Sequence, residues 1–201
     1  ARLLTRKPII FDAFTSHYCG YILDRKLFSR YSWRAHYYRF LDRWSCNFAD
    51  VVLLDTNAHI RFFADEFGIS RGKFRRIFVG SDDSVFYPRK ISPVSDRFLV
   101  HFHGSFIPLQ GIEHILHAAK ILEDENLVIR IIGKGQTYVE IRSLADHLHL
   151  RNVTFISSMS YEALAERIAE ADVCLGIFGD SSKTNLVIPN KVFEALASGR
   201  P

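Results

Sequence analysis

The sequence lacks the features that mark a membrane-spanning or secreted chain. No stretch approaches the roughly 20 uninterrupted apolar residues that a spanning helix needs, and the first residues lack the charged, apolar and small-residue regions of a signal peptide. Only three of the 201 residues are cysteines, and Cys19, Cys46 and Cys174 match no metal or disulfide spacing. This scarcity predicts a reducing compartment, so we expect a cytoplasmic globular protein.

Two further absences bear on function and on completeness. No GxGxxG motif follows any apolar run, which argues against a nicotinamide-dependent oxidoreductase built on the same kind of sheet. The chain also begins at Ala1 without an initiator methionine and ends directly after a helix terminator. These ends predict a fragment of a longer protein.

The composition is that of a globular protein with an uneven distribution of charge. Hydrophobic residues make up 48% of the chain and charged residues 24%, enough for one large core or two smaller ones. Residues 1–90 carry 16 Lys and Arg against 9 Asp and Glu, whereas residues 91–201 carry 10 against 13. The basic first part suits an anionic membrane surface or a phosphate-bearing acceptor, or is an ordinary solvated face.

Apolar runs and helical patterns alternate along the first 90 residues. Strands are predicted at 8–14, 50–56 and 76–79, with Asn57 capping the helix that ends at Gly68. Such alternation indicates right-handed parallel crossover units. We place a domain boundary near residue 90.

The segment 21–48 interleaves arginines with aromatic residues. One interpretation is an interfacial helix, with aromatic rings among lipid headgroups and arginines reaching phosphates. The other is a helix whose core side carries Trp33, Tyr37, Phe40, Leu41 and Trp44. Basic and aromatic residues also stack on bases, but no nucleic-acid motif is present, so we expect no nucleic-acid partner.

The second part repeats the alternation from residue 91 to the end. Strands are predicted at 97–103, 127–132, 152–156 and 173–178, and Ser160 caps the helix before the last of them. His101 and His103 point to the same face of the first strand; an HxH pair is a possible metal ligand, but we favour a structural or substrate-edge role. Helix starts at the carboxyl ends of parallel strands form an anion-binding crevice.

The final stretch, EADVCLGIFG followed by IPNKVFEALASGRP, resembles the nucleotide-sugar-binding half of family-4 retaining glycosyltransferases of the GT-B fold, of the bacterial surface-polysaccharide type. The resemblance extends back through HGSFIPLQGIEHILHAAKIL to about residue 97. It implies an α/β fold with two Rossmann-like parallel-sheet domains, both incomplete in this chain. Residues 1–90 would be the end of the acceptor-side domain with its linker, and residues 91–201 the nucleotide-sugar domain, truncated at its carboxyl end.

The resemblance also implies which residues bind the donor. Glu194 holds the place of the second acid in the Glu-x7-Glu signature, which accepts hydrogen bonds from ribose hydroxyls. The donor-site candidates as a set are Gly104, Ser105, Gln110, Gly133, Lys134, Met159, Lys183, Asn190, Lys191 and Glu194. No catalytic residue is identified, and we expect Glu194 and the amino end of its helix to face an open crevice.

Three positions depart from the family pattern. Ser105 and Gln110 stand where the family carries the Arg and Lys that neutralise the donor diphosphate, and Leu186 stands where it carries the first acid. Neutral donors hold phosphate less strongly than charged ones. Lys183 or Lys191 would restore the missing charge if either faced the crevice.

The resemblance therefore implies a retaining, metal-independent hexosyl- or glycosyltransferase of the EC 2.4 class, without a cofactor. It would move a sugar from a nucleotide-diphosphate sugar to a polysaccharide or lipid-linked acceptor. The altered loop leaves a second hypothesis open, a nucleotide-sugar-binding module without efficient transfer. Segment 21–48 would contact the inner face of the membrane peripherally.

Overall fold

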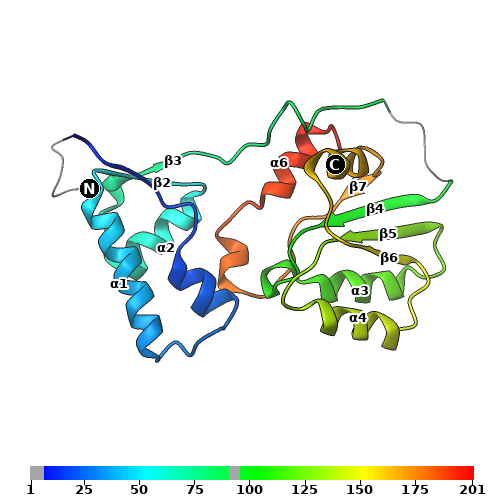
Figure 1. Ribbon diagram of the computed structural model, residues 1–201, viewed down its shortest axis with the longest axis horizontal. Helices are drawn as coiled ribbons and strands as arrows, with labels where there is room; N and C mark the ends of the chain where they lie inside the picture. Colours follow the sequence, from blue (N-terminus) through cyan, green and yellow to red (C-terminus); the bar gives the residue numbers. More distant parts are fainter. Residues whose placement is uncertain (1–6, 91–95) are drawn as a thin grey trace. The chain divides into compact units, whose positions relative to one another are not determined.

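The computed structural model describes residues 7–90 and 96–201. It divides into two compact units, one comprising Ala1–Val79 with Ser181–Ile188 and the other Gly80–Asp180 with Pro189–Pro201. Each unit contains one sheet, and every strand pair in both sheets is parallel. The predicted α/β class with two parallel sheets is confirmed (Figure 1).

The first unit is a three-stranded sheet in the order β1-β2-β3. Its strands are β1 (Ile10–Asp12), β2 (Val51–Leu54) and β3 (Phe74–Arg76); its helices are η1 (Tyr18–Asp24), α1 (Trp33–Phe48), α2 (Asn57–Phe67), η2 (Arg71–Lys73) and η4 (Ser182–Asn185). Because sequential strands are neighbours, two right-handed crossovers place α1 and α2 on the same face of the sheet, as Figure 1 shows.

The helix α1 contributes little of its aromatic content to the core. Ala35 and Cys46 are buried, and the partly buried Tyr38 packs against the same cluster as Val52 and Phe63. The predicted core positions Trp33, Tyr37, Phe40 and Trp44 are instead exposed on the other side of the helix, and Leu41 is half-buried. The core-side interpretation of this stripe is therefore wrong, because the helix turns its small residues to the sheet.

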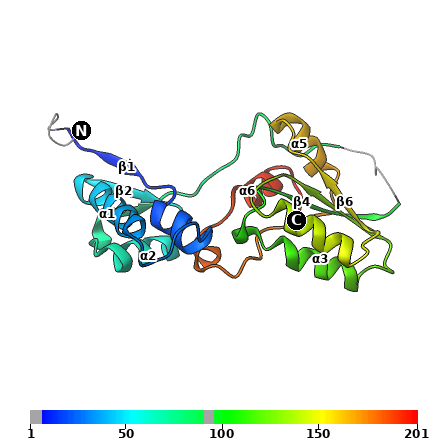
Figure 2. The ribbon, with the colours of Figure 1, turned by 60° about the horizontal axis from the view of Figure 1, so that its bottom comes forward.

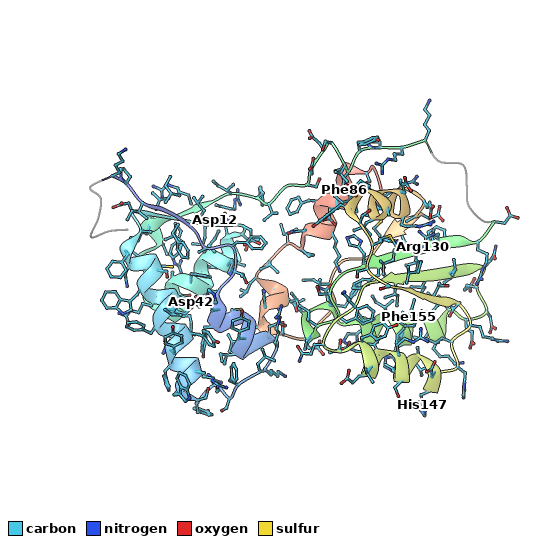
Figure 3. The ribbon with its side chains drawn as sticks, viewed as in Figure 1. Asp12, Asp42, Phe86, Arg130, His147 and Phe155 are labelled. Carbon is cyan, nitrogen blue, oxygen red and sulfur yellow. The ribbon has the colours of Figure 1, made fainter. Side chains whose placement is uncertain are left out.

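One buried carboxylate joins α1 to η1. Asp42 accepts hydrogen bonds from the hydroxyl of Ser16 at 2.6 Å and from the backbone N–H groups of His17 and Tyr18 at 3.2 and 2.9 Å. It thereby satisfies donors at the start of η1, which would otherwise be unpaired. Figure 3 labels Asp42 on α1. The helix η1 begins at Tyr18, the last of these donors.

The second unit is a four-stranded sheet in the order β6-β5-β4-β7. Its strands are β4 (Phe98–His103), β5 (Leu127–Ile132), β6 (Val153–Ile156) and β7 (Val173–Cys174); its helices are η3 (Pro108–Gln110), α3 (Ile112–Ile121), α4 (Tyr138–His147), α5 (Tyr161–Ala169) and α6 (Asn190–Ala197). The chain moves outward from β4 to β6 and then returns past β4 to β7. This reversal puts α3 and α4 on one face and α5 and α6 on the other (Figures 1 and 2).

Each face of this sheet has its own core. Phe102, Phe106 and Leu116 belong to the larger cluster under α3 and α4. On the other face, Phe86 packs with Ala165 and Ile168 of α5, and the partly buried Cys174 and Ala197 join them. The sheet is therefore covered on both sides, which explains the nearly continuous apolar sequence of β5.

Local signals located most element boundaries, with three exceptions. The third strand is Phe74–Arg76 rather than 76–79. The last strand stops at Cys174 rather than Phe178, because β7 pairs with β4 only at Val100 and His101. The cap of α2 is Thr56, whose hydroxyl accepts from the His59 N–H at 2.9 Å, rather than Asn57.

Two features are excluded for the described residues: a thiolate at Cys19 or Cys46, and a helix that crosses a bilayer. Burial raises the pKa of the Cys19 thiol to about 11 and that of Cys46 to about 12, so neither is a thiolate at neutral pH. Within residues 7–90 and 96–201, no helix has the length and apolar character needed to cross a bilayer.

The end of β5 supplies a test of the fold. A Cβ on Gly133 would lie 2.0 Å from the carbonyl oxygen of Gly104, and Gly133 has φ 147°. We expect Gly133→Ala to lower the free energy of unfolding by about 1–3 kcal/mol, as overpacking does, measured by urea denaturation. Gly80→Ala is the matched control, because its Cβ meets nothing within 4 Å; equal effects of the two changes would contradict the packing argument.

Candidate functional site

The strand order of the second unit creates one place suited to a ligand. The order of the strands reverses at β4: β5 and β6 are added on one side of it, and β7 is added on the other side. In open α/β sheets, ligands bind beyond the carboxyl ends of the strands at such a reversal. The residues that follow β4, starting at Gly104, and the first turn of α6 meet at this point.

Glu194 of α6 is joined there to two histidines of β4. Its Oε2 lies 2.7 Å from Nε2 of His103, and Nδ1 of His103 lies 3.0 Å from Nε2 of His101. The Glu194 and His103 side chains are each about 10% exposed, and His101 is fully buried. The crevice-facing carboxylate expected from the sequence is thus nearly buried and already holds a protein partner.

In the form with both imidazoles neutral, one tautomer pair satisfies this chain of contacts. A carboxylate oxygen accepts, so Nε2 of His103 carries its proton and Nδ1 is left as an acceptor for Nε2–H of His101. Nδ1 of His101 is then a bare acceptor, consistent with its having no hydrogen-bond partner. Burial, followed by the charges of His103, Arg130 and Lys191, lowers the pKa of His101 to about 3, so its ring is neutral at pH 7.

Lys191, on the same helix, places an ammonium group beside the loop after β4. Its Nζ lies 2.5 Å from Oε1 of Gln110, 3.5 Å from the carbonyl oxygen of Gly176 and 3.7 Å from the centre of the Phe102 ring. A Cβ on Gly104 would stand 2.9 Å from Nζ. Glycine at this position therefore leaves room for the ammonium group.

The ammonium of Lys191 occupies a site that disfavours charge. Its side chain is buried, and burial lowers the pKa to about 7, while the nearby Glu194 carboxylate acts in the opposite direction. At pH 7 such a lysine is about half charged, and an arriving anion raises its pKa and completes the charge. The site is therefore prepared for a negatively charged ligand.

The amino end of α6 adds a second source of positive potential. Its N-cap, Pro189, makes no side-chain capping hydrogen bond. Ser32, Thr56 and Ser160 cap α1, α2 and α5 with their hydroxyls, whereas α3 and α4, like α6, lack such a bond. Uncapped amides at a helix start attract anions.

The other predicted donor residues have more varied positions. Ser105 follows β4, Lys134 follows β5, Met159 follows β6 and Asn190 starts α6, all at the same edge of the sheet; the first two and Asn190 are exposed and Met159 is half-buried. The close approach permitted by Gly133 is to the carbonyl of Gly104. The close packing between the ends of β4 and β5 is therefore enough to explain why residue 133 is a glycine, whether or not a ligand approaches it.

Lys183 and Leu186 belong to the other compact unit. Nζ of Lys183 lies 3.4 Å from the hydroxyl of Thr15, and the carbonyl oxygen of Leu186 accepts a hydrogen bond from Thr56. Of the two lysines proposed from the sequence to restore charge, the structure brings Lys191 to Gln110.

Sequence reasoning favoured a structural or substrate-edge role for His103 and gave Phe102, whose ring lies under the ammonium of Lys191, no role. The HxH pattern marked the two histidines as sharing one face, and they do: their rings contact each other. Among the described residues, no group of three or more His, Cys, Asp or Glu is arranged to hold a metal ion. The partner of His103 is a carboxylate 91 positions later, which no local pattern could indicate.

Comparisons with known proteins agree with this architecture. The chain is 30% identical over 104 residues to "Putative colanic acid biosynthesis glycosyl transferase WcaI" of Escherichia coli (strain K12), a match that covers 52% of this chain and 25% of that protein. It is 27% identical over 139 residues to "MMP alpha-(1->4)-mannosyltransferase" of Mycolicibacterium hassiacum, covering 68% and 32%. The chain thus spans about a quarter to a third of these relatives.

Solved structures share the fold at low identity. Anabaena Alr3699/HepE in complex with UDP and glucose superposes with a TM-score of 0.72 at 18% identity, over 100% of this chain and 53% of that one. WaaG, a glycosyltransferase of lipopolysaccharide biosynthesis, gives 0.70 at 17% identity, over 98% and 56%. The fold is that of the Rossmann-like GT-B glycosyltransferases. The family model described as "Glycosyl transferases group 1" matches residues 85–201, more than half of the chain, which therefore belongs to this family.

Proposed function

We propose that the second unit binds the nucleotide-diphosphate sugar for a glycosyltransferase, and that the transfer is retaining and metal-independent. The observation that carries this proposal is the convergence of Lys191 and Glu194, one helical turn apart, at the switch point beyond β4. A cation and uncapped amides suit a diphosphate. A carboxylate beside them suits ribose hydroxyls.

In this proposal Lys191 takes the place of the two missing cations. The family carries Arg and Lys where this chain has Ser105 and Gln110, and the ammonium of Lys191 lies at Gln110 and next to Gly104. Such fixed positive charge would stabilise the departing diphosphate. The sugar would leave this site for an acceptor glycan or a lipid-linked saccharide, and no cofactor would be needed.

Glu194 would accept hydrogen bonds from ribose hydroxyls through the carboxylate lone pairs that do not contact His103. A carboxylate has about four lone-pair positions, and the contact with His103 occupies one of them. His103 would thereby set the direction of the carboxylate, acting as a positioning residue. Since the carboxylate is nearly buried, ribose would have to enter close against α6.

Membrane contact through segment 21–48, at the inner face, is part of the same proposal, because a lipid-linked acceptor resides in a bilayer. The alternative function, a nucleotide-sugar-binding module, is favoured by the neutral residues Ser105 and Gln110 and by Leu186. Turnover by the longer protein with donor and lipid-linked acceptor supports the transferase. Tight donor binding without transfer supports the module.

The first test is a thermal-shift screen with UDP, GDP, ADP and dTDP. A ligand that binds only the folded state raises stability according to its concentration and affinity. We expect one diphosphate to raise the melting temperature more than the others, with UDP the first candidate because UDP was bound to HepE. No response to any of the four would contradict donor binding.

Glu194 variants separate donor binding from folding. We expect Glu194→Ala to weaken binding of the selected nucleotide by about 1.5–3 kcal/mol, measured by calorimetry, and to lower stability because Nε2–H of His103 loses its acceptor. Glu194→Gln is the matched control: its amide oxygen keeps the contact with His103 but not the charge. Stability should recover in Glu194→Gln while affinity stays reduced; full affinity in both variants would remove Glu194 from the site.

Lys191 makes donor binding depend on pH. The pKa of its ammonium in the free protein is about 7, so the charged form is lost as pH rises above that value. Because a diphosphate binds the charged form, we expect affinity to fall between pH 7 and 9, by up to about tenfold per pH unit, for a nucleotide-diphosphate sugar whose own phosphates stay ionised.

Two variants check the source of this pH dependence. Lys191→Met removes the charge at similar length, and should weaken binding at pH 6 and abolish the slope. Lys134→Met changes an exposed lysine at the same edge and should leave the slope intact. A slope that persists in Lys191→Met would assign it to another group.

A further inference from the structure

The outward face of α1 carries a continuous row of exposed aromatic side chains. Trp33, Tyr37, Phe40, Trp44 and Phe48 are between 43% and 71% exposed and recur at helical spacing. Rings contact each other in three of the four neighbouring pairs, with centroids 6.4 Å apart for Trp33 and Tyr37, 5.7 Å for Phe40 and Trp44, and 5.3 Å for Trp44 and Phe48. An apolar patch of this extent marks an interaction surface. We call these five residues the aromatic row.

The exposed charge that residues 25–48 contribute around the aromatic row has one sign. Residues 25–48 contain six Lys and Arg, all of them exposed, whereas the only carboxylate in this range, Asp42, is buried. Asp42 is also occupied by Ser16, His17 and Tyr18. The surface that α1 presents outward is therefore aromatic and positive, with no exposed acid of its own.

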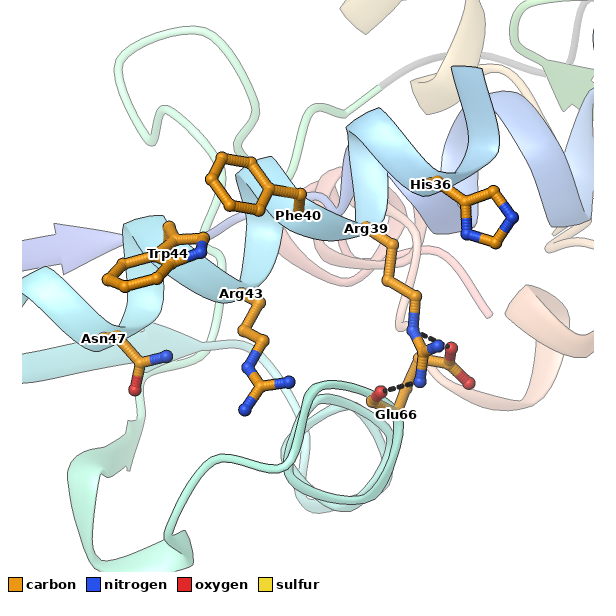
Figure 4. Close-up of a pocket in the computed structure, with 7 residues that line it drawn as sticks. All are labelled: His36, Arg39, Phe40, Arg43, Trp44, Asn47 and Glu66. Carbon is orange, nitrogen blue, oxygen red and sulfur yellow. Dashed lines mark hydrogen bonds and ion pairs between the residues drawn. The ribbon is translucent and has the colours of Figure 1, made fainter. Parts of the chain in front are cut away.

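A groove beside the row contains an arginine free to bind an external anion. It measures about 520 Å³ and is lined by residues of α1 together with Glu66 of α2 (Figure 4). Arg39 is held by Glu66, through Nε–Oε1 at 2.9 Å and through the backbone oxygen at 2.8 Å. Arg43 also lines the groove, and among the described residues nothing forms an ion pair or hydrogen bond with it.

We propose that the aromatic row docks on an anionic phospholipid bilayer, with its rings at the headgroup level and Arg43 binding a lipid phosphate in the groove. Aromatic rings with one polar edge partition to the membrane interface, and arginines beside them reach phosphate groups while their stems stay in apolar surroundings. Arg34 fits the same role, because its guanidinium lies over the rings of Phe28 and Trp33. The proposal narrows membrane contact to one face of one helix and does not depend on sugar transfer.

The chain carries its own reporters for this test. Its only two tryptophans are Trp33 and Trp44, both in the aromatic row. We expect phosphatidylglycerol-containing vesicles to shift tryptophan emission to shorter wavelength and to sediment with the protein. Phosphatidylcholine vesicles should do so weakly, and added salt should reverse the effect.

Substitutions identify the groups responsible. Arg43→Gln should weaken vesicle binding about fivefold, whereas Arg142→Gln, which removes the same charge from the other unit, should not. Tyr37→Ser combined with Phe40→Ser keeps both tryptophans and should abolish the emission shift. Since these side chains are exposed, thermal melting should be unchanged, which separates lost docking from lost folding.

Four outcomes would overturn the proposal. One is an absence of binding to phosphatidylglycerol vesicles, and another is binding that survives the Tyr37 and Phe40 substitutions. An equal emission shift with inorganic phosphate or with single-stranded RNA alone would identify a soluble anion or a nucleic acid as the partner. Protection of both tryptophans from acrylamide quenching in the longer protein without vesicles would show that another part of the protein, or a second copy, covers the row.

Discussion

The junction between α6 and the end of β4 is the interaction on which the second unit's chemistry depends. Two side chains of one helix reach two different partners there: Glu194 meets His103, and Lys191 meets Gln110. All four groups are buried or nearly so, and buried polar groups are costly unless they are paired. The pairing therefore fixes how α6 lies against the sheet and, with it, the arrangement of charge that a diphosphate sugar would meet.

In α1 of the first unit, the usual arrangement of a helix, with apolar side chains toward the core and charged side chains outward, is partly reversed. In α1 a carboxylate, Asp42, is buried as a cap for η1, while the large aromatic residues face outward. A helix that served only the core would reverse this pattern. Packing on the parallel sheet accounts for the inward face of α1, and the proposed docking on an anionic bilayer would account for the outward face.

Sequence reasoning succeeded where the signal was local. The span of β5 and the Ser160 cap of α5 agree with prediction, because burial on both faces gives an apolar run and a hydroxyl cap has a fixed position. It failed for the aromatic residues of α1, because periodicity shows that residues share a face but not which way the face points. It also misplaced the end of β7, which is determined by where β4 offers pairing partners.

The amino-acid sequence by itself determined the α/β class and the parallel sheets, and its resemblance to a family suggested the donor-site candidates and the two neutral positions Ser105 and Gln110. Only the tertiary structure decided that Lys191 lies at that loop and that Glu194 is held by His103. The partners in these two contacts are 81 and 91 positions apart. Their meeting follows from the reversal of strand order at β4 and β7, and helix and strand periodicity, which extend over a few residues, carry no information about it.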